Sequence, residues 1–250
     1  MPRQTLDVYD SDGDAFEATA DRVAALLQAD HGSGRLAVAL SGGRGGRGVM
    51  IALSARPDLP WARIDWYFAD DRCVPPDDQH SNVRLARENL LGPRRVPAAQ
   101  IMAPPAGLDE PTAVAAAYAA TLTSKLGGDP PVFDLVLLGI GPDGHVASLA
   151  PGCAALRATT AVAVVEAGEM RTAPAVARIT LTPRVLAAAR HVLVTACGKE
   201  KAAAVAAALK EPHDPLVRPA QCVSPSERVG WILDLTAADG LIHDAVPAPQ

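Results

Sequence analysis

The sequence predicts an α/β fold in which helices cover both faces of a mostly parallel β-sheet. Short, continuous apolar runs recur along the chain, as is typical of strands buried in a parallel sheet. Between these runs lie longer stretches with helical periodicity or a high alanine content. Strands that alternate with helices indicate parallel pairing, because each helix returns the chain to the same edge of the sheet.

The elements follow one another in a regular order. The predicted strands lie at 36–40, 64–68, 133–138, 161–165, 191–195 and 229–235. The predicted helices lie at 14–30, 82–91, 110–126, 183–189, 199–209 and 237–243, and a helix-compatible stretch leads from a glycine cluster at 42–48 to Ser54. The first helix places its apolar residues on one face, and the paired glycines 127 and 128 end the alanine-rich one. This order predicts a Rossmann-like, three-layer architecture.

Length and charge limit the organisation and the partners. At 250 residues the chain is near the upper limit for one hydrophobic core, so a single domain spanning 1–250 is expected. The net charge of −5 gives no basic surface for nucleic acid, and no protein partner is evident. A small anion remains possible as a ligand, because local arginines and backbone amides would bind it.

The cysteines and the apolar runs indicate the compartment. Cys73, Cys153, Cys197 and Cys222 form no C-x-x-C pair and match no zinc-binding spacing. Free thiols and no metal site are therefore expected, which fits a reducing compartment. The sequence shows neither a secretory signal nor an apolar run long enough to span a membrane. A cytoplasmic protein without membrane contact is predicted.

Four predicted strands end in residues that core packing does not require. These ends are Ser41-Gly42-Gly43, Asp70-Asp71-Arg72, Gly139 to His145, and Gly198-Lys199-Glu200-Lys201. Ligands of open parallel sheets bind beyond the carboxyl ends of the strands. Glycine, aspartate, histidine and lysine at several such ends therefore predict a functional site at this edge.

The glycine cluster has two interpretations. A glycine-rich loop before a helix presents free amides to an anion, although it can also be a plain strand-to-helix turn. Gly43 to Gly48 also matches the dinucleotide pattern G-x-G-x-x-G. That pattern needs an acid at the end of the next strand to hold the ribose hydroxyls. Asp65 lies at the start of that strand, and Asp70 comes later in the sequence than the pattern requires. Their positions therefore argue against a dinucleotide site.

The charged residues at the strand ends can likewise be interpreted either as functional groups or as ordinary exposed charges. Arg72 and Asp70 either form a solvated ion pair or belong to a binding site. In a site, the planar guanidinium of Arg72 would bind a phosphate, and the carboxylate would orient a nearby histidine or water. Lys199 and Lys201 are either exposed charges or phosphate ligands, with Lys201 the better candidate. His145 lies in a tight loop of three glycines and a proline. Because histidine titrates near neutral pH, this placement favours a general base over a structural role.

With these residues in place, the chain resembles the 6-phosphogluconolactonase family over most of its length. The matching segments are Leu40-Ser-Gly-Gly43, Asp70-Asp-Arg-Cys-Val74 with Ser81-Asn82, the long segment from Phe133 to Leu149, Arg178-Ile-Thr-Leu-Thr182, and Gly198-Lys-Glu-Lys201. The long segment is highly specific, and all five occur in the family's order. The sequence departs from the family at Arg44-Gly45-Gly46, where a hydroxyl residue, threonine and proline are usual, and also at Asp71 and Ala150.

The resemblance implies a fold of the sugar-phosphate isomerase and deaminase type and a cofactor-free reaction. The implied reaction is hydrolysis of 6-phospho-D-glucono-1,5-lactone to 6-phospho-D-gluconate in the pentose phosphate pathway. In this resemblance His145 falls on the general base and Asp70 on its acidic partner. The implied substrate ligands are Ser41, Gly42, Gly43, Arg44, Arg72, Arg178 and Lys201, of which Arg72 and Lys201 would hold the phosphate.

Three rival functions remain open from sequence. A sugar-phosphate deaminase or isomerase would share the Gly-Asp-Gly-His loop, but Ala147-Ser148-Leu149 follows His145 where the deaminase pattern has an aromatic residue, asparagine and glutamate. The others are an NAD-dependent oxidoreductase and a non-catalytic sugar-phosphate sensor. Cofactor-free opening of a lactone would separate the hydrolase from all three.

Overall fold

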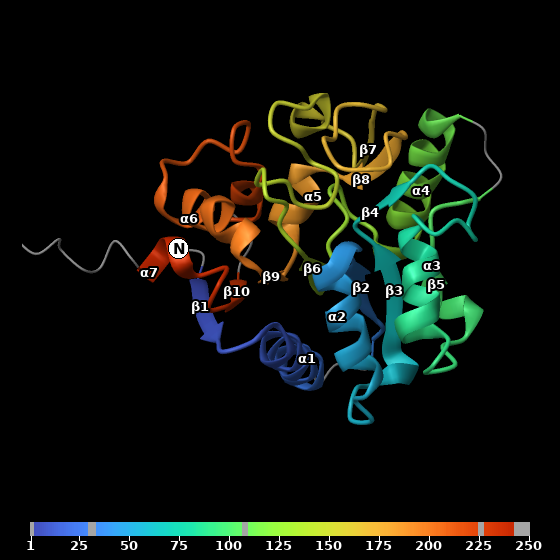
Figure 1. The fold of residues 1–250 in the computed structure, drawn as a ribbon. Helices are drawn as coiled ribbons and strands as arrows, with labels where there is room; N and C mark the ends of the chain where they lie inside the picture. Colours follow the sequence, from blue (N-terminus) through green and yellow to red (C-terminus); the bar gives the residue numbers. More distant parts are fainter. Residues whose placement is uncertain (1–2, 30–33, 107–109, 225–227, 243–250) are drawn as a thin grey trace, which may run out of the picture.

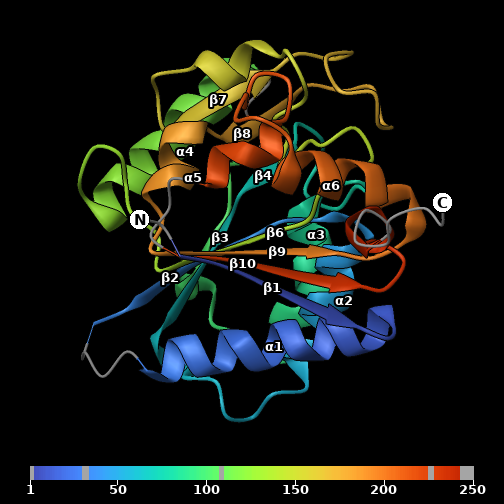
Figure 2. The ribbon, with the colours of Figure 1, turned by 90° about the vertical axis from the view of Figure 1, so that its left-hand side faces the viewer.

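A seven-stranded, fully parallel sheet forms the centre of the molecule (Figures 1 and 2). The computed structural model describes residues 3–29, 34–106, 110–224 and 228–242. The order across the sheet is β1 (Arg3–Tyr9), β10 (Arg228–Asp234), β9 (His191–Ala196), β6 (Leu135–Leu138), β2 (Leu36–Leu40), β3 (Ile64–Phe68) and β5 (Ile101–Met102). The predicted mostly parallel sheet is confirmed.

Helices pack on both faces of this sheet, so the predicted three layers are also confirmed. One apolar cluster joins the sheet to α1 (Asp12–Ala29), α2 (Gly43–Ser54), α3 (Asn82–Ala86) and the π-helical turn η2 (Arg87–Leu91). The cluster on the opposite face joins it to α4 (Pro111–Leu126), α5 (Pro183–Ala188) and α6 (Ala202–Lys210), and α7 (Asp239–Ile242) packs on α6. Short 3-10 turns complete the fold at η1 (Trp61–Arg63), η3 (Ala98–Gln100), η4 (Ala154–Arg157), η5 (Lys199–Lys201) and η6 (Pro219–Val223).

A small antiparallel sheet lies beside the main one. Its order is β4 (Asp70–Arg72), β8 (Arg178–Leu181) and β7 (Val162–Val165), and Arg72 is paired with Arg178 in its register. The sequence treated Asp70-Asp71-Arg72 as the end of the preceding strand, and it did not predict β8 as a strand. Both differences have one cause, because β4 and β8 pair with each other across more than 100 residues of sequence.

The glycine cluster is helical rather than a loop, which corrects the prediction. Helix α2 already begins at Gly43. A Cβ on Gly46 would lie 2.2 Å from the carbonyl oxygen of Ser41, and one on Gly48 would lie 2.3 Å from the Phe16 ring. These glycines therefore let the start of α2 pack against the end of β2 and against α1.

The strand β1 was not predicted from sequence. It is an edge strand bonded to β10 alone, and its Leu6 and Val8 side chains are 47% and 40% exposed. An edge strand of this kind lacks the continuous apolar run that marks a strand buried on both faces. Only its pairing with a strand more than 200 residues away identifies it.

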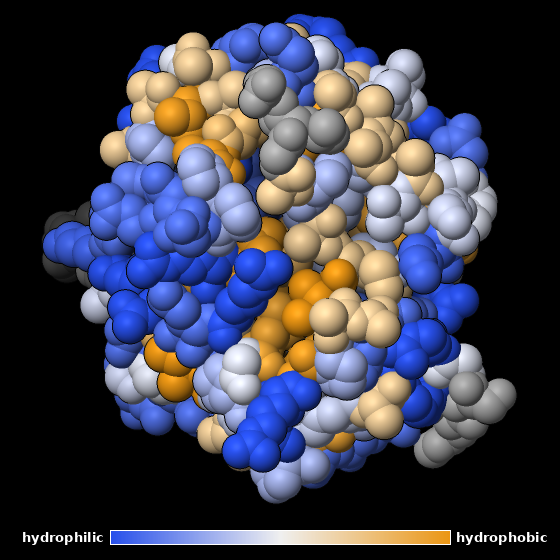
Figure 3. All heavy atoms as spheres, turned by 90° about the vertical axis from the view of Figure 1, so that its right-hand side faces the viewer, coloured by the Kyte–Doolittle hydropathy of each residue, from blue (hydrophilic) through white to orange (hydrophobic). Residues whose placement is uncertain are grey.

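A hollow lined by apolar residues lies on the side of α3, α4 and β5, and Figure 3 views that side. Its volume is about 520 Å³, and Val83, Val114 and Ile179 line it. Asp71 and Arg72 of β4 also line it. Strand β4 thus separates this hollow from the pocket at the carboxyl edge of the main sheet, which Arg72 also lines.

Candidate active site

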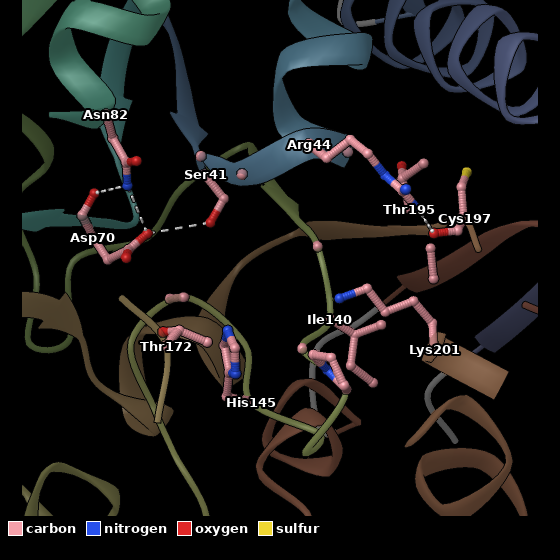
Figure 4. A pocket seen from close by; sticks show the side chains of 18 of the residues that line it. Ser41, Arg44, Asp70, Asn82, Ile140, His145, Thr172, Thr195, Cys197 and Lys201 are labelled. Carbon is pink, nitrogen blue, oxygen red and sulfur yellow. Dashed lines mark hydrogen bonds between the residues drawn. The ribbon is translucent and has the colours of Figure 1, made fainter. Parts of the chain in front are cut away.

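A pocket of about 360 Å³ opens at the carboxyl edge of the main sheet. It lies where β2 and β6 are neighbours and the chain runs outward from them in opposite directions, which is the usual place for a ligand in such sheets. All nine residues predicted from sequence line it: Ser41, Gly42, Gly43, Arg44, Asp70, Arg72, His145, Arg178 and Lys201. The predicted gathering of strand ends is therefore confirmed, and Figure 4 shows the pocket from close by.

His145 and Asp143 form a tightly bonded pair in the loop after β6. Nδ1 of His145 lies 2.5 Å from Oδ1 of Asp143, and the His145 backbone amide donates to the same carboxylate oxygen at 3.2 Å. Burial raises the pKa of Asp143, but the hydrogen bonds and charge of His145 outweigh this and lower the pKa to about 2. The carboxylate thus stays ionised and fixes the ring, with Nδ1–H donating.

Asp70 has partners other than His145, which corrects the expected pairing of these two residues. Its carboxylate accepts hydrogen bonds from Ser148 Oγ at 2.6 Å, Asn82 Nδ2 at 3.2 Å and Ser41 Oγ at 3.3 Å. Asp70 is only 5% exposed, so these donors stabilise a nearly buried charge. It still lines the pocket, where a free lone pair can face substrate or water.

Arg72 and Arg178 form a cationic pair on β4 and β8, in which Arg178 is buried and Arg72 is partly buried. Arg72 Nη1 donates to Asn82 Oδ1 and to the His80 carbonyl, both at 2.8 Å. Arg178 is 2% exposed, and its Nη2 donates to the Thr172 carbonyl at 3.0 Å. Burial, and then the charge of Arg72, lower the pKa of Arg178. Two guanidinium groups so close together indicate a site for an anion.

Lys201 and Arg44 form a second, more exposed cationic pair. Arg44 Nη2 donates to the Cys197 carbonyl at 2.7 Å and to Glu200 Oε1 at 3.0 Å. Gly198 makes this possible, since a Cβ there would lie 2.4 Å from Arg44 Nη2. Burial lowers the pKa of Lys201, Glu200 and Asp143 oppose this, and Arg44 adds to it. Figure 4 shows Arg44 and Lys201 together on the side of the pocket opposite Asp70 and Asn82.

The glycines at the start of α2 form another part of the pocket wall. Gly42 is the N-cap of this twelve-residue helix, and no side chain caps it. Gly43 has φ +77°, a conformation that favours glycine. A Cβ on Gly42 would lie 1.9 Å from Asn82 Oδ1, so Gly42 allows Asn82 to reach Asp70 and Arg72.

Sequence reasoning missed the roles of Asp143 and Asn82. Asp143 stands two residues before His145, a spacing at which an aspartate commonly bonds the following backbone amide. That signal was available in the sequence. Asn82 is forty residues after Gly42, and no local pattern connects them. Arg47, three residues after Arg44, bonds Asn89 and does not line the pocket.

Features expected of other functions are placed elsewhere. Asp65, the nearer acid for a dinucleotide site, lies at the start of β3 and forms a two-pronged ion pair with Arg35 at 2.6 Å. The four cysteines are free thiols. Within residues 3–29, 34–106, 110–224 and 228–242, no group of three or more His, Cys, Asp or Glu side chains could hold a metal ion. No helix in those ranges is long and apolar enough to cross a membrane.

Known proteins share both the sequence and the fold of this chain. Residues 10–231 match the family of glucosamine-6-phosphate isomerases and 6-phosphogluconolactonases. The 6-phosphogluconolactonase of Streptomyces coelicolor is 36% identical, over 93% of this chain and 92% of its own length. That of Rattus norvegicus is also 36% identical, over 89% of this chain and 86% of its own.

Solved structures agree with the sequence matches. The 6-phosphogluconolactonase from Trypanosoma brucei superposes with a TM-score of 0.84 at 29% identity, covering 96% of this chain and all of that one. A monomeric glucosamine-6-phosphate deaminase reaches a TM-score of 0.79 at 19% identity, which shows the shared fold alone. The chain therefore belongs to the glucosamine-6-phosphate isomerase and 6-phosphogluconolactonase family, and within it to the 6-phosphogluconolactonases, which are hydrolases.

Proposed function

We propose that this protein hydrolyses 6-phospho-D-glucono-1,5-lactone to 6-phospho-D-gluconate, as the pentose phosphate pathway requires, with His145 as general base. The observation that carries the proposal is the His145–Asp143 pair at 2.5 Å inside a pocket that also contains four cations. The pocket thus combines a base held in one tautomer with cationic groups for a phosphorylated substrate. Relatives named for this activity support the same reaction.

In this mechanism Nε2 of His145 accepts a proton from a water molecule as the water attacks the lactone carbonyl carbon. The carbonyl oxygen becomes an oxyanion in the tetrahedral intermediate. When the intermediate collapses, the bond to the ring oxygen breaks, and the imidazolium returns its proton to that oxygen. The ionised Asp143 stabilises the imidazolium between the two steps.

The other pocket residues orient the substrate. Asp70, held by Ser41, Asn82 and Ser148, would accept a hydrogen bond from the attacking water or from a sugar hydroxyl. The amides at the start of α2, together with Lys201, are suited to the phosphate, because helix N-termini favour anions. No metal or organic cofactor enters any step, and a cytoplasmic site of action and a single domain over 1–250 stay predictions.

The test is proton release from freshly made lactone, with a chelator present and spontaneous hydrolysis subtracted. We expect the wild-type protein to accelerate ring opening without added cofactor. His145→Ala should lower kcat by roughly 10²–10⁴-fold, the usual contribution of a general base, with an unchanged circular dichroism spectrum. Near-wild-type kcat in this variant would remove His145 from the mechanism, and no acceleration by wild type would overturn the function itself.

A deaminase on the same fold is the second candidate that the structure addresses. In this chain Ser148, three residues after His145, is fully buried and donates to Asp70 rather than facing substrate. A deaminase of the pattern considered above would need an acidic side chain in this segment. Incubation with glucosamine 6-phosphate should therefore release no ammonia.

A further inference from the structure

A second hollow, of about 720 Å³, opens at the edge of the main sheet opposite the candidate active site. Ala37 near the start of β2, Tyr67 of β3 and Asp134, directly before β6, are among the residues that line it. Ala37 precedes Ser41 of the candidate active site on the same strand, so roughly 13 Å of extended chain separates the two places. The hollow has the size of a site for a small molecule and shares no lining residue with the active-site pocket.

The carboxylates that line this hollow are neutralised by arginines. Asp65 accepts two hydrogen bonds from Arg35, each at 2.6 Å. Asp134 accepts one from Arg190 at 2.9 Å and another from a backbone amide of β2 at 2.8 Å. Lys125, in the last turn of α4, also lines the hollow and has no hydrogen bond or ion pair with any residue that the structure describes. The uncompensated charge of the hollow is therefore positive.

The hydroxyl of Tyr67 is a hydrogen-bond donor without an acceptor. The residue is only 1% exposed, and its ring contacts the Phe133 ring edge-on with centroids 5.3 Å apart. Its oxygen has no partner in the described part of the chain, yet it is accessible from the hollow. Burial raises the pKa of Tyr67 to about 12, so the hydroxyl keeps its proton at neutral pH. The charges that also act on it are those of Asp65, Arg35 and Asp134, all of which line the hollow.

Tyr118 shows how a buried tyrosine is satisfied elsewhere in the same core. It is also 1% exposed, and its hydroxyl donates to the Phe68 carbonyl at 2.9 Å and accepts the Phe68 amide at 2.8 Å. Buried polar groups are normally paired in this way. The unpaired hydroxyl of Tyr67 is thus an exception, and it faces a space large enough for a ligand.

Apolar side chains form the remaining walls of the hollow. Val132 is 41% exposed, and Leu126 and Met102 are partly buried at its sides. An apolar group that covered these side chains would remove their surface from water, which is favourable. The hollow therefore offers apolar contact, one free donor and one free positive charge.

We propose that this hollow binds a small carboxylate with an apolar body. A carboxylate oxygen accepts the hydrogen bond of the Tyr67 hydroxyl, and its negative charge faces Lys125. The apolar body covers Leu126 and Val132. A cationic ligand is excluded by charge, because it would meet Lys125 while both carboxylates of the hollow are already paired. This site lies outside the proposed lactone hydrolysis and does not depend on it.

The test uses benzoate and benzylamine, which share one apolar ring and carry opposite charges at neutral pH. Ligand-observed NMR titrations give both affinities for the wild-type protein. We expect benzoate to bind at least about 10-fold more tightly, which is the size of one hydrogen bond to a charged group. Equal affinities, tighter binding of benzylamine or the absence of saturable benzoate binding would each overturn the proposal.

Two variants locate the bound anion. Tyr67→Phe removes only the hydroxyl and should weaken benzoate by about 10-fold or more. Lys125→Gln should weaken it by about 2- to 5-fold, because an exposed ion pair contributes less. Wild-type affinity for benzoate in either variant would mean that the carboxylate is not held in this hollow.

Two control variants separate this site from general effects of substitution and from the active site. Tyr118→Phe removes a hydroxyl that has partners, so it should lower Tm and keep the affinity for benzoate, whereas Tyr67→Phe should not lower Tm. Arg44→Gln, which changes a cation of the active-site pocket, should also keep that affinity. If Arg44→Gln weakened benzoate as much as Tyr67→Phe, or if Tyr67→Phe lowered Tm as much as Tyr118→Phe, the proposal would be wrong. Failure of the proposed function would appear separately, as absent lactone hydrolysis by wild type.

Discussion

Nδ1 of His145 lies 2.5 Å from Oδ1 of Asp143, two residues earlier in the loop that follows β6. The same carboxylate oxygen accepts the His145 backbone amide, so the loop folds around one aspartate. Gly141 completes the arrangement, because a Cβ at that position would lie 2.0 Å from the histidine Nδ1. The loop thus fixes the ring position and its tautomer before any substrate arrives.

Replacing Asp143 by asparagine should lower kcat strongly. Asparagine keeps the size of the side chain but has no charge to stabilise the imidazolium, and its amide can select the wrong tautomer. By comparison with aspartate-to-asparagine changes in catalytic triads, a loss of up to roughly 10⁴-fold is expected. Steady-state lactone hydrolysis measures it, with the affinity for 6-phosphogluconate as a control that should change little. Unchanged kcat would mean that the aspartate serves only the loop structure.

Asp71 should make the stability of the protein depend on pH. Burial of this carboxyl raises its pKa to about 6, despite hydrogen bonds from the amides of Asn82 and Arg72 that favour the ionised form. In the unfolded chain its pKa is about 3.9. The folded protein therefore retains the proton more readily, and the stability that this provides is lost as pH rises from about 4 to about 6.

The comparison is between wild type and Asp71→Asn, whose side chain cannot ionise. Urea unfolding at pH 4, 5, 6 and 7 would give the difference in unfolding free energy at each pH. We expect wild type to lose up to about 3 kcal/mol relative to the variant over this range, since each pKa unit corresponds to about 1.4 kcal/mol. A difference that is constant with pH would show that Asp71 does not titrate in this window.

Two glycines of the same helix should respond oppositely to alanine. A Cβ on Gly42 would lie 1.9 Å from Asn82 Oδ1, which holds Arg72, whereas one on Gly45 meets nothing closer than 3.6 Å. Gly42→Ala should destabilise the protein by roughly 1–3 kcal/mol through overpacking and should lower kcat. Gly45→Ala should be neutral or stabilise by up to about 1 kcal/mol. Thermal unfolding measures both, and equal effects would remove the proposed role of the Gly42–Asn82 contact.

The start of α2 should bind no dinucleotide. Asp65, the acid nearest the expected distance from the glycines, is neutralised by Arg35 at the opposite end of β3. Asp70 follows the carboxyl end of that strand, but it comes later than the pattern requires, and its carboxylate is bonded by Ser41, Asn82 and Ser148 rather than left free for ribose hydroxyls. Calorimetry with oxidised and reduced NAD and NADP should detect no binding at physiological concentrations. Micromolar affinity for any of the four would restore the oxidoreductase alternative.

Much of the scaffold follows from local sequence. The strands β2 and β3 match the predicted ranges 36–40 and 64–68 at both ends, because every residue of each is buried and only Asp65 interrupts their apolar runs. The helical stretches 110–126 and 183–189 agree to within one residue at each end with α4 and α5. Elements that depend on distant partners were less predictable: the edge strand β1 and the strands β4 and β8 of the small sheet have no distinctive local pattern of their own, although β7 was predicted at 161–165.

The sequence by itself determined that Ser41, Asp70, His145 and Lys201 meet at one edge of the sheet. That result needs only parallel strands, whatever their order across the sheet, because their carboxyl ends must lie along one edge. Tertiary structure decided which side chains pair within the pocket: Asp143 rather than Asp70 with the histidine, and Arg178 rather than Lys201 with Arg72. Such pairing depends on the direction of each side chain and on contacts between strands distant in sequence, such as β4 and β8, which no local pattern encodes.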